Sequence, residues 1–323
     1  MQISVIIPLL NEAESLNELY ARIKKICTQE NLSYEVIFVD DGSTDESWKV
    51  ISELTAENTD CVRGIRFAKN YGKSQALNAA FKAAQGEVVI TMDADLQDFP
   101  EEIPALRKMI VEDNYDLVSG WKRKRYDSVL TKNIPSKLFN WAARKTSGVY
   151  LNDFNCGLKA YKNQVVKAVD VYGEMHRYIP VLAKNAGFSR ITEKEVPHQA
   201  RLYGRSKFGM SRFIRGFLDL ITLWFVSRFG SSPMYFFGSM GTLMFIIGFF
   251  SAFWIIITKL LKVFYWHEPA ILVALNPLFY LALTVMILGM QLFIAGFLGE
   301  LIVRLKRDQR KEDYNILQYL NIK

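Results

Sequence analysis

The sequence predicts an α/β chain in which a mostly parallel, Rossmann-like sheet is followed by two membrane-spanning helices. Apolar strands at residues 3–7, 35–39 and 87–90 are separated by stretches with helical spacing of apolar residues, the alternation typical of βαβ units. Two nearly uncharged runs follow at 234–258 and 277–303, and about 20 apolar residues suffice to cross a bilayer. The chain therefore divides into a large polar part and a membrane part.

The connecting helices are expected at residues 13–27, 46–55 and 74–84, of which the first carries leucines and isoleucines at helical spacing. A further strand at 115–120 leads into the basic stretch 122–125. The motif G-x-G-x-x-G does not follow the first strand, and G-x-x-x-x-G-K-[ST] is absent from the sequence. The chain is therefore not expected to be a dinucleotide oxidoreductase or a P-loop NTPase. Nucleic acid is not expected as a partner.

Each of the first three strands ends in polar side chains. Asn11 and Glu12 follow the first strand, DDGS at 40–43 follows the second, and DAD at 93–95 follows the third. Open α/β sheets bind ligands at the carboxyl ends of their strands. We therefore expect the three groups to meet in one crevice.

The carboxylates in the run TMDADLQD at 91–98 need a cation or strong hydrogen-bond donors, because like charges this close repel. Asp93 and Asp95 can approach one hard cation, and Gln97 can add an amide oxygen. Mg²⁺ and Mn²⁺ accept one or two carboxylates together with substrate phosphates and water. The alternative is that the two aspartates only cap the helix that starts at 99–102.

The second acidic group, at 40–45, has two interpretations. Asp, Ser, Thr and Gly are typical of a capped turn. Beside another acidic strand end, Asp40 and Asp41 could instead bind the imide N–H of uracil or guanine, or ribose hydroxyls. Lys73 lies near an expected helix start, where it suits a phosphate contact, although a solvated lysine is the simpler alternative.

The net charge of +7 is concentrated around the membrane part. Basic residues cluster before the first span, at 201–215, and after the second, at 304–311, whereas the link at 259–269 holds only two lysines. The positive-inside rule then places both termini in the cytoplasm. Three scattered cysteines, Cys27, Cys61 and Cys156, show no metal or disulfide spacing, which fits a reducing compartment.

Four parts are expected along the chain. They are a cytoplasmic domain at 1–205, interfacial amphipathic helices at 206–232, a two-helix transmembrane hairpin at 233–303 and a basic cytoplasmic tail at 304–323. In the second part, apolar residues alternate with arginines, which suits a helix lying in the headgroup region; a helix packed between domains is the alternative. Glycines in the spans permit close packing and make a homo-oligomer plausible.

Several stretches together resemble inverting family 2 glycosyltransferases with the A-type fold. They are IIPLLNE at 6–12, VDDGSTD at 39–45 and DADLQ at 93–97. DFNCGLK at 153–159 and MHRYIP at 175–180, with the two spans, extend the resemblance to polyprenyl-phosphate glycosyltransferases. Within that group the chain is similar to bactoprenol glucosyltransferases, dolichol-phosphate mannose synthases and the undecaprenyl-phosphate aminoarabinose-derivative transferase.

The resemblance implies a role for each matching residue. The base site would be lined by Pro8, Leu10, Glu12, Asp40 and Asp41. Asp93 would face the ribose or diphosphate, while Asp95 and Gln97 would hold the metal. The phosphates of donor and lipid would be bound by Arg123, Arg201, Arg205, Ser206 and Lys207. The chain departs from the family at two places: Leu10 replaces an aromatic residue, and Gly157 stands where some relatives have a proposed aspartate base. Asp153 fits the aspartate of the mannose synthases, so the resemblance implies Asp95 and Asp153 as the catalytic residues.

The expected function is inverting, metal-dependent transfer of a sugar from a UDP- or GDP-linked donor to undecaprenyl or another polyprenyl phosphate. The reaction would take place at the cytoplasmic face of the membrane and feed cell-envelope glycan or lipid modification. A processive polysaccharide synthase is the alternative enzyme, although the Q-x-x-R-W motif is absent from the sequence. A non-catalytic membrane-anchored partner is the alternative outside enzymes.

Overall fold

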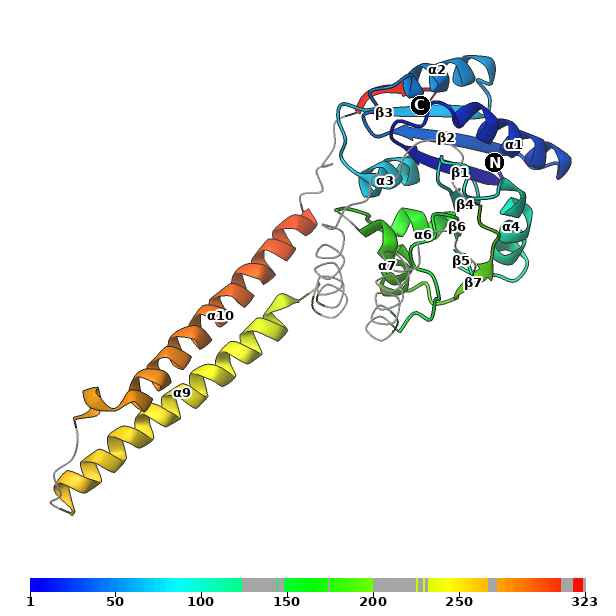
Figure 1. Ribbon diagram of the computed structural model, residues 1–323. Coiled ribbons are helices and arrows are strands. Elements are labelled where there is room, and N and C mark those ends of the chain that lie inside the picture. The colour runs from blue at the N-terminus through cyan, green and yellow to red at the C-terminus, as the bar shows by residue number, and fades with distance from the viewer. Residues whose placement is uncertain are drawn as a thin grey trace. The chain divides into compact units, whose positions relative to one another are not determined.

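The computed structural model describes residues 1–123, 148–173, 175–199, 232–266, 272–308 and 316–321, together with 144, 225 and 229. Two compact units make up the chain, Met1–Ser227 with Glu312–Lys323, and Arg228–Lys311. The first unit contains an α/β sheet and the second a pair of long helices (Figure 1).

The first half of the sheet unit alternates strands and helices, as the sequence predicts. Its elements are β1 (Ile3–Leu9), α1 (Leu16–Gln29), β2 (Tyr34–Asp40), α2 (Ser47–Glu57), β3 (Val62–Phe67), α3 (Lys73–Ala83), β4 (Val88–Thr91), η1 (Pro100–Glu102), α4 (Ile103–Val111) and β5 (Leu117–Trp121). Strands β1, β2, β3 and β4 pair in parallel. Their carboxyl ends therefore lie at one edge.

Five shorter elements complete the unit's second half, and a final strand follows the membrane helices. They are β6 (Lys159–Lys162), α6 (Asn163–Ala168), η3 (Met175–Tyr178), α7 (Ile179–Asn185), β7 (Ile191–Glu195) and β8 (Ile316–Leu320). The eight strands have the order β7-β5-β6-β4-β1-β2-β3-β8. Strand β6 is antiparallel to both β4 and β5, and β8 is antiparallel to β3. The sheet is therefore mixed, with a parallel centre.

Helices cover both faces of the sheet. On one face, α1, α2 and α4 pack through residues such as Leu19, Ile51 and Leu106. On the other, α3 and α7 pack through residues such as Phe81 and Ile179. The central strands bury side chains on both faces, which explains why their sequences are nearly continuous apolar runs.

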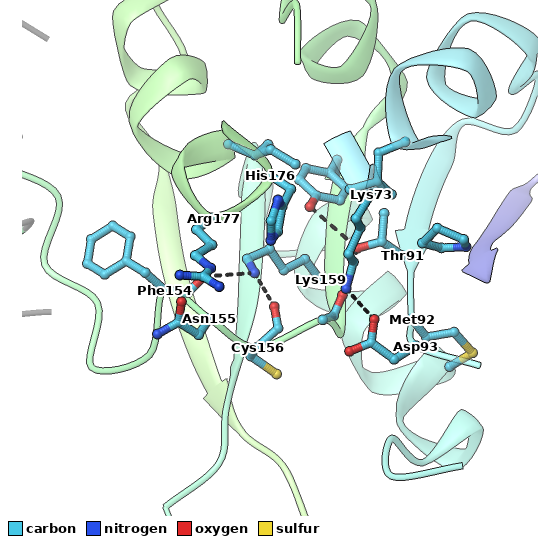
Figure 2. Close-up of a pocket in the computed structure, with 15 residues that line it drawn as sticks. Lys73, Thr91, Met92, Asp93, Phe154, Asn155, Cys156, Lys159, His176 and Arg177 are labelled. Atoms are coloured by element: carbon cyan, nitrogen blue, oxygen red, sulfur yellow. Dashed lines mark hydrogen bonds and ion pairs between the residues drawn. The ribbon is translucent and has the colours of Figure 1, made fainter. Parts of the chain in front are cut away.

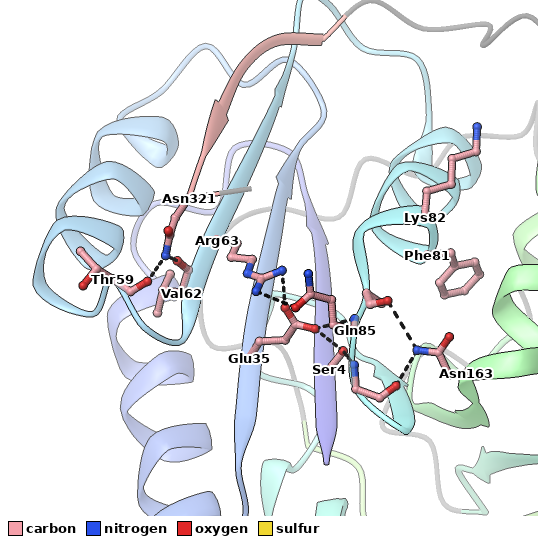
Figure 3. A network of polar contacts seen from close by, with 12 residues as sticks. Ser4, Glu35, Thr59, Val62, Arg63, Phe81, Lys82, Gln85, Asn163 and Asn321 are labelled. Atoms are coloured by element: carbon pink, nitrogen blue, oxygen red, sulfur yellow. Dashed lines mark hydrogen bonds and ion pairs between the residues drawn. The ribbon is translucent and has the colours of Figure 1, made fainter. Parts of the chain in front are cut away.

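A buried carboxylate joins the amino ends of the central strands (Figure 3). Glu35 is fully buried and accepts hydrogen bonds from the Ser4 hydroxyl at 2.5 Å and from the Gln85 N–H at 2.7 Å. Arg63 on β3 lies 2.9 Å from its second oxygen. The Ser4 hydroxyl in turn accepts the Gly86 N–H at 2.7 Å. The network thus ties β1, β2 and β3 to the turn before β4.

The second unit consists of α9 (Pro233–Phe264) and α10 (Pro277–Asp308), with η4 (Val273–Leu275) between them. Both are long and apolar enough to cross a membrane. Gly241 and Gly289 let the two helices approach, because a Cβ at either position would lie 2.5–2.6 Å from the other's carbonyl oxygen. These glycines serve packing within the hairpin, as small residues commonly do in membranes.

The segment 304–323 is expected to be a basic tail, but parts of it form a helix end and a strand. Helix α10 continues to Asp308, and β8 pairs with the outer edge of β3. Leu320 packs against the core, and the Asn321 side chain donates to the carbonyl of Thr59. The sequence pattern does not predict β8, because a charged run precedes it and its partner strand lies more than 200 residues earlier in the sequence. Most of 206–232 lies outside the described residues, so the interfacial helices stay a prediction.

Replacement of Glu35 by alanine is expected to destabilise the protein strongly, because Arg63 and the Gln85 N–H lose their buried partner. Removing one member of a buried ion pair costs about 3–5 kcal/mol, which for a domain of this size corresponds to a fall of roughly 6–20 °C in the midpoint of thermal unfolding. The measurement is thermal unfolding of the full-length protein in detergent at one scan rate. Exposed Glu53 on α2 provides the control, E53A. Equal midpoints for the two variants would contradict the role of the network.

Candidate active site

The polar strand ends meet at one edge of the sheet, as the sequence predicts. The loop after β1 is joined to the loop after β2, since the Asn11 N–H donates to the Ser43 hydroxyl at 2.9 Å and the Asn11 side chain accepts the Thr44 N–H at 2.8 Å. The loop after β2 is joined to the start of α3, because the Asp41 carboxylate accepts the N–H groups of Tyr71 and Gly72 at 2.7 and 2.9 Å.

Asp40 and Asp41 are both buried. Asp40 accepts the Ser43 N–H at 2.8 Å and lies 3.7 Å from the Arg66 guanidinium. Burial raises the pKa of Asp41 to about 6, although its two backbone hydrogen bonds oppose the rise and Asp40 adds to it. Asp40 thus caps its own turn, whereas Asp41 joins the loop to the start of α3. Neither lines the pocket described below.

The turn after β4 holds its backbone in an unusual conformation. Leu96 is fully buried with φ of 59°, a left-handed value that costs free energy for a bulky side chain. Asp98 accepts the Asp93 N–H at 3.2 Å and forms a buried ion pair with Lys122 at 2.7 Å. Asp98 and Lys122 therefore hold the DADLQ turn against the end of β5.

Asp93 is surrounded by cations. Its carboxylate forms an ion pair with Lys73 at the start of α3. Burial would raise the pKa of Asp93, but Lys73, Lys122 and Lys159 outweigh it and lower the pKa to about 2. On its other side the carboxylate touches Gly157, where an added Cβ would lie 2.5 Å from a carboxylate oxygen. Asp93 is therefore ionised at neutral pH, and it fits because residue 157 has no side chain.

A pocket opens beside this ion pair (Figure 2). Its walls come from β1, α3, β4, the loop before β6, β6, η3 and α7. The lining residues are Pro8, Lys73, Leu77, Thr91, Met92, Asp93, Phe154, Asn155, Cys156, Gly157, Lys159, Tyr161, His176, Arg177 and Ile179. Its charged side chains are three cations and one carboxylate, so the described lining favours an anionic ligand.

Some of the expected site residues lie together here and others do not. Pro8, Lys73 and Asp93 line the pocket. Leu10 and Glu12 lie in the loop after β1, and the Glu12 N–H donates to the Ser47 hydroxyl at 3.0 Å. Asp153 is only 2% exposed, accepts the Asn155 N–H at 3.0 Å and is not among the residues that line the pocket.

The residues expected to bind phosphate are mostly beyond what the structure describes. Arg123 is described, and its side chain is 66% exposed and lies 3.6 Å from Glu195. Arg201, Arg205, Ser206 and Lys207 lie outside the described residues. The described chain before them ends at Gln199, whose side chain donates to the Leu96 carbonyl in the DADLQ turn, while the Gln97 side chain donates to the Gln199 carbonyl at 3.4 Å.

The DADLQ turn suits a hard divalent cation that keeps part of its water. Asp95 is half-buried, and its Oδ1 accepts the Gln97 N–H at 3.2 Å. Among the described residues, no group of three or more His, Cys, Asp or Glu side chains could hold a metal. The chain would therefore supply at most two carboxylates, together with the Gln97 amide oxygen, and leave the remaining positions to substrate phosphates and water, the arrangement that Mg²⁺ favours.

Four functional candidates were not assigned a role from the sequence: Asp98, Lys122, Lys159 and Arg177. Asp98 lies in the acidic run 91–98 and Lys122 in the basic run 122–125, and the sequence pattern points to other members of both runs. Lys159 and Arg177 lie in stretches that contribute to the family resemblance, but a lysine in a strand and an arginine before a helix have no pattern of their own. Only contacts between distant parts of the sequence pair Asp98 with Lys122 and place Lys159 and Arg177 in one pocket lining.

Comparison with known proteins identifies the family. A model of glycosyl transferase family 2 matches residues 4–169, just over half of the chain. The chain belongs to glycosyltransferase family 2. The strands and loops that build the site, from β1 to β6, lie within the matched residues, and η3 and α7 lie beyond them.

Similar proteins extend the likeness over the membrane hairpin. Dodecaprenyl-phosphate galacturonate synthase of Rhizobium johnstonii is 31% identical over 323 residues, covering 98% of this chain and 93% of that protein. Undecaprenyl-phosphate 4-deoxy-4-formamido-L-arabinose transferase of Aeromonas hydrophila is 36% identical over 308 residues, covering 95% and 90%. The predicted resemblance to polyprenyl-phosphate glycosyltransferases is confirmed, and this family 2 chain is an enzyme.

Solved structures confirm the A-type glycosyltransferase fold. Glucosyl-3-phosphoglycerate synthase of Mycobacterium tuberculosis, crystallised with Mn²⁺, UDP and phosphoglyceric acid, superposes with a TM-score of 0.55 at 16% identity, covering 70% of this chain and 78% of that one. Mannosyl-3-phosphoglycerate synthase of Rubrobacter xylanophilus gives 0.56 at 16% identity, covering 70% and 74%. At this identity the likeness concerns the fold alone.

Replacement of Gly157 by alanine is expected to reduce turnover at least tenfold with little change in thermal stability. The added methyl group must displace the Asp93 carboxylate, which can swing away, and a displacement of about 1 Å at a reacting group can cost 100-fold in rate. The measurement is kcat with the midpoint of thermal unfolding. Wild-type turnover in G157A would show that the position of Asp93 is unimportant.

Proposed function

We propose that this family 2 enzyme transfers a sugar from a UDP- or GDP-linked donor to undecaprenyl or another polyprenyl phosphate, with inversion, at the cytoplasmic face of the membrane. The observation that carries the proposal is the coverage of the relatives, which extends over the sheet unit and the hairpin together. Their names supply two candidate sugars, a uronic acid and a modified pentose. Neither name suggests the processive synthesis of a polysaccharide, the alternative considered from the sequence.

The donor is proposed to lie along the carboxyl ends of the central strands. Pro8, Leu10 and Glu12 after β1, with Asp40 and Asp41 after β2, would receive the base and ribose. Lys73 lies at the first position of α3, and helix amino ends favour anions. When the donor binds, its diphosphate would accept hydrogen bonds from the Lys73 ammonium, which forms an ion pair with Asp93 in the structure.

Asp95 and Gln97, with Asp93, are proposed to hold Mg²⁺ or Mn²⁺ at the DADLQ turn. When bound, such an ion neutralises the diphosphate and stabilises it as a leaving group. The chain's own contribution is to hold the turn in place, through Asp98 and Lys122, and to keep Asp93 ionised.

The acceptor phosphate is proposed to be the nucleophile. A phosphate monoester is already ionised near neutral pH, so it needs no strong base. Its oxygen forms a bond to the anomeric carbon from the face opposite the diphosphate. The bond between that carbon and the diphosphate oxygen breaks, and its electron pair leaves on the diphosphate. Because Asp153 is buried and is not among the residues that line the pocket, this mechanism gives it the task of holding the 154–157 loop. Positioning and charge stabilisation supply the rate.

The membrane part is proposed to hold the lipid acceptor. The α9–α10 hairpin would span the bilayer, with both termini in the cytoplasm as the basic residues at 201–215 and 304–311 indicate. Arg201, Arg205, Ser206 and Lys207 follow closely in sequence after Gln199, which contacts the DADLQ turn. They, and Arg123, are proposed to bind phosphate as the resemblance implies. A homo-oligomer is not part of the proposal, because the glycines that suggested one pack within the hairpin.

Transfer is tested by incubating the full-length protein in membranes with undecaprenyl phosphate and labelled UDP- and GDP-sugars, then extracting the lipid. Wild-type protein is expected to yield labelled lipid with one donor. Asp95→Ala should lower turnover by more than tenfold even at saturating donor, because the metal loses its carboxylate ligand.

The matched control is Asp113→Ala, which removes an exposed carboxylate distant in sequence from the turn and should leave transfer unchanged. Retention of a tenth or more of wild-type turnover by D95A would remove the proposed metal role. Absence of labelled lipid from the wild type with every donor would remove the proposed function.

A further inference from the structure

The cations of the pocket form two groups (Figure 2). Lys73 lies beside Asp93 and forms an ion pair with it. Lys159 on β6 and Arg177 on η3 lie toward the loop of Phe154 and Asn155. The first group has a carboxylate partner in the pocket lining. The second group has none there.

Lys159 is a buried cation held by carbonyl groups. It is 4% exposed, and its ammonium donates to the carbonyl of Phe154 at 3.2 Å and to that of Cys156. An ammonium has three N–H donors, so these two bonds leave one donor for the pocket that Lys159 lines. Removing a cation from water is costly unless other groups satisfy it. A bound anion would provide that stabilisation.

Arg177 adds a second cation to the same side. It is half-buried and lines the pocket, and no hydrogen bond or ion pair joins its guanidinium to any residue within the described part of the chain. Burial lowers the pKa of His176 well below its usual value, and the charges of Lys73, Arg177 and Lys159 lower it further. His176 therefore stays neutral between the two groups, while the Ser74 hydroxyl lies 3.2 Å from its Nδ1. The histidine adds no counter-charge.

We propose that Arg177 and Lys159 form an anion-binding subsite, separate from the diphosphate site at Lys73, that binds a phosphate or carboxylate group of a substrate. A planar guanidinium matches both groups with two parallel hydrogen bonds. The inference rests on the proposed function, in which two substrate groups fit this chemistry. They are the phosphate of the lipid acceptor and the carboxylate of a uronic acid donor.

The kinetic test compares wild type, Arg177→Gln and Arg177→Lys as full-length proteins. Loss of one charge-assisted contact should raise the KM of the substrate that binds there by roughly 10- to 100-fold, with R177K intermediate because it keeps the charge but not the fork. A raised KM for undecaprenyl phosphate alone identifies the acceptor phosphate. A raised KM only for a uronic acid donor, compared with its neutral hexose counterpart, identifies the sugar carboxylate. The matched control is R190Q, since Arg190 is exposed and lies outside the pocket lining.

A binding test does not depend on activity. Inorganic phosphate should raise the midpoint of thermal unfolding of wild-type protein and of R190Q, and R177Q should lose most of that rise. R177Q could lose the phosphate-induced rise in the unfolding midpoint while all its KM values stay within twofold of wild type. That result would mean an adventitious ion only, and would overturn the subsite. Unchanged protection in R177Q would overturn it as well. If wild-type protein transfers no sugar yet shows phosphate protection that needs Arg177, the proposed function fails and the anion site stands.

Discussion

The ion pair between Lys73 and Asp93 is the interaction on which the arrangement of the crevice depends. It joins the start of α3 to the end of β4, and Asp93 is held in place by its neighbours. Gly157 leaves room for the carboxylate, while Asp98 binds the Asp93 backbone and is itself neutralised by Lys122. The result is a carboxylate that stays ionised beside several cations, in a pocket to which a negatively charged substrate can be admitted.

The two ends of the central strands illustrate opposite uses of buried charge. At the amino ends, both oxygens of Glu35 have partners in Ser4, Gln85 and Arg63, so the network stabilises the sheet. At the carboxyl ends, the pocket lining carries more cations than carboxylates, and the buried ammonium of Lys159 donates to carbonyl groups. Unbalanced charge of this kind is costly for stability and useful for binding. The difference separates a structural charge cluster from a functional one.

The sequence alone predicts the parts of the fold in which local pattern and tertiary structure agree. Strands β1, β2, β4 and β5 and helices α1, α2 and α3 are recognisable because the central strands are apolar throughout and the helices have an apolar face. Strand β3 was missed because Arg63 and Arg66 interrupt its apolar residues. Strands β6 and β7 are short and polar, and β8 follows a basic run, so their pairing depends on distant partners. The candidate site divides similarly: Asp93 and Lys73 are marked by strand and helix ends, whereas Lys159 and Arg177 are brought together only by the fold.

The role of the DADLQ turn is tested most directly by diffraction from crystals of the full-length protein grown with Mn²⁺ and UDP or GDP. We expect an anomalous manganese peak within about 2.5 Å of an Asp95 oxygen, a distance that hard divalent ions keep to carboxylates, with the diphosphate bridging the ion and Lys73. A diphosphate bound away from the turn, or a manganese ion with no contact to Asp95, would contradict it.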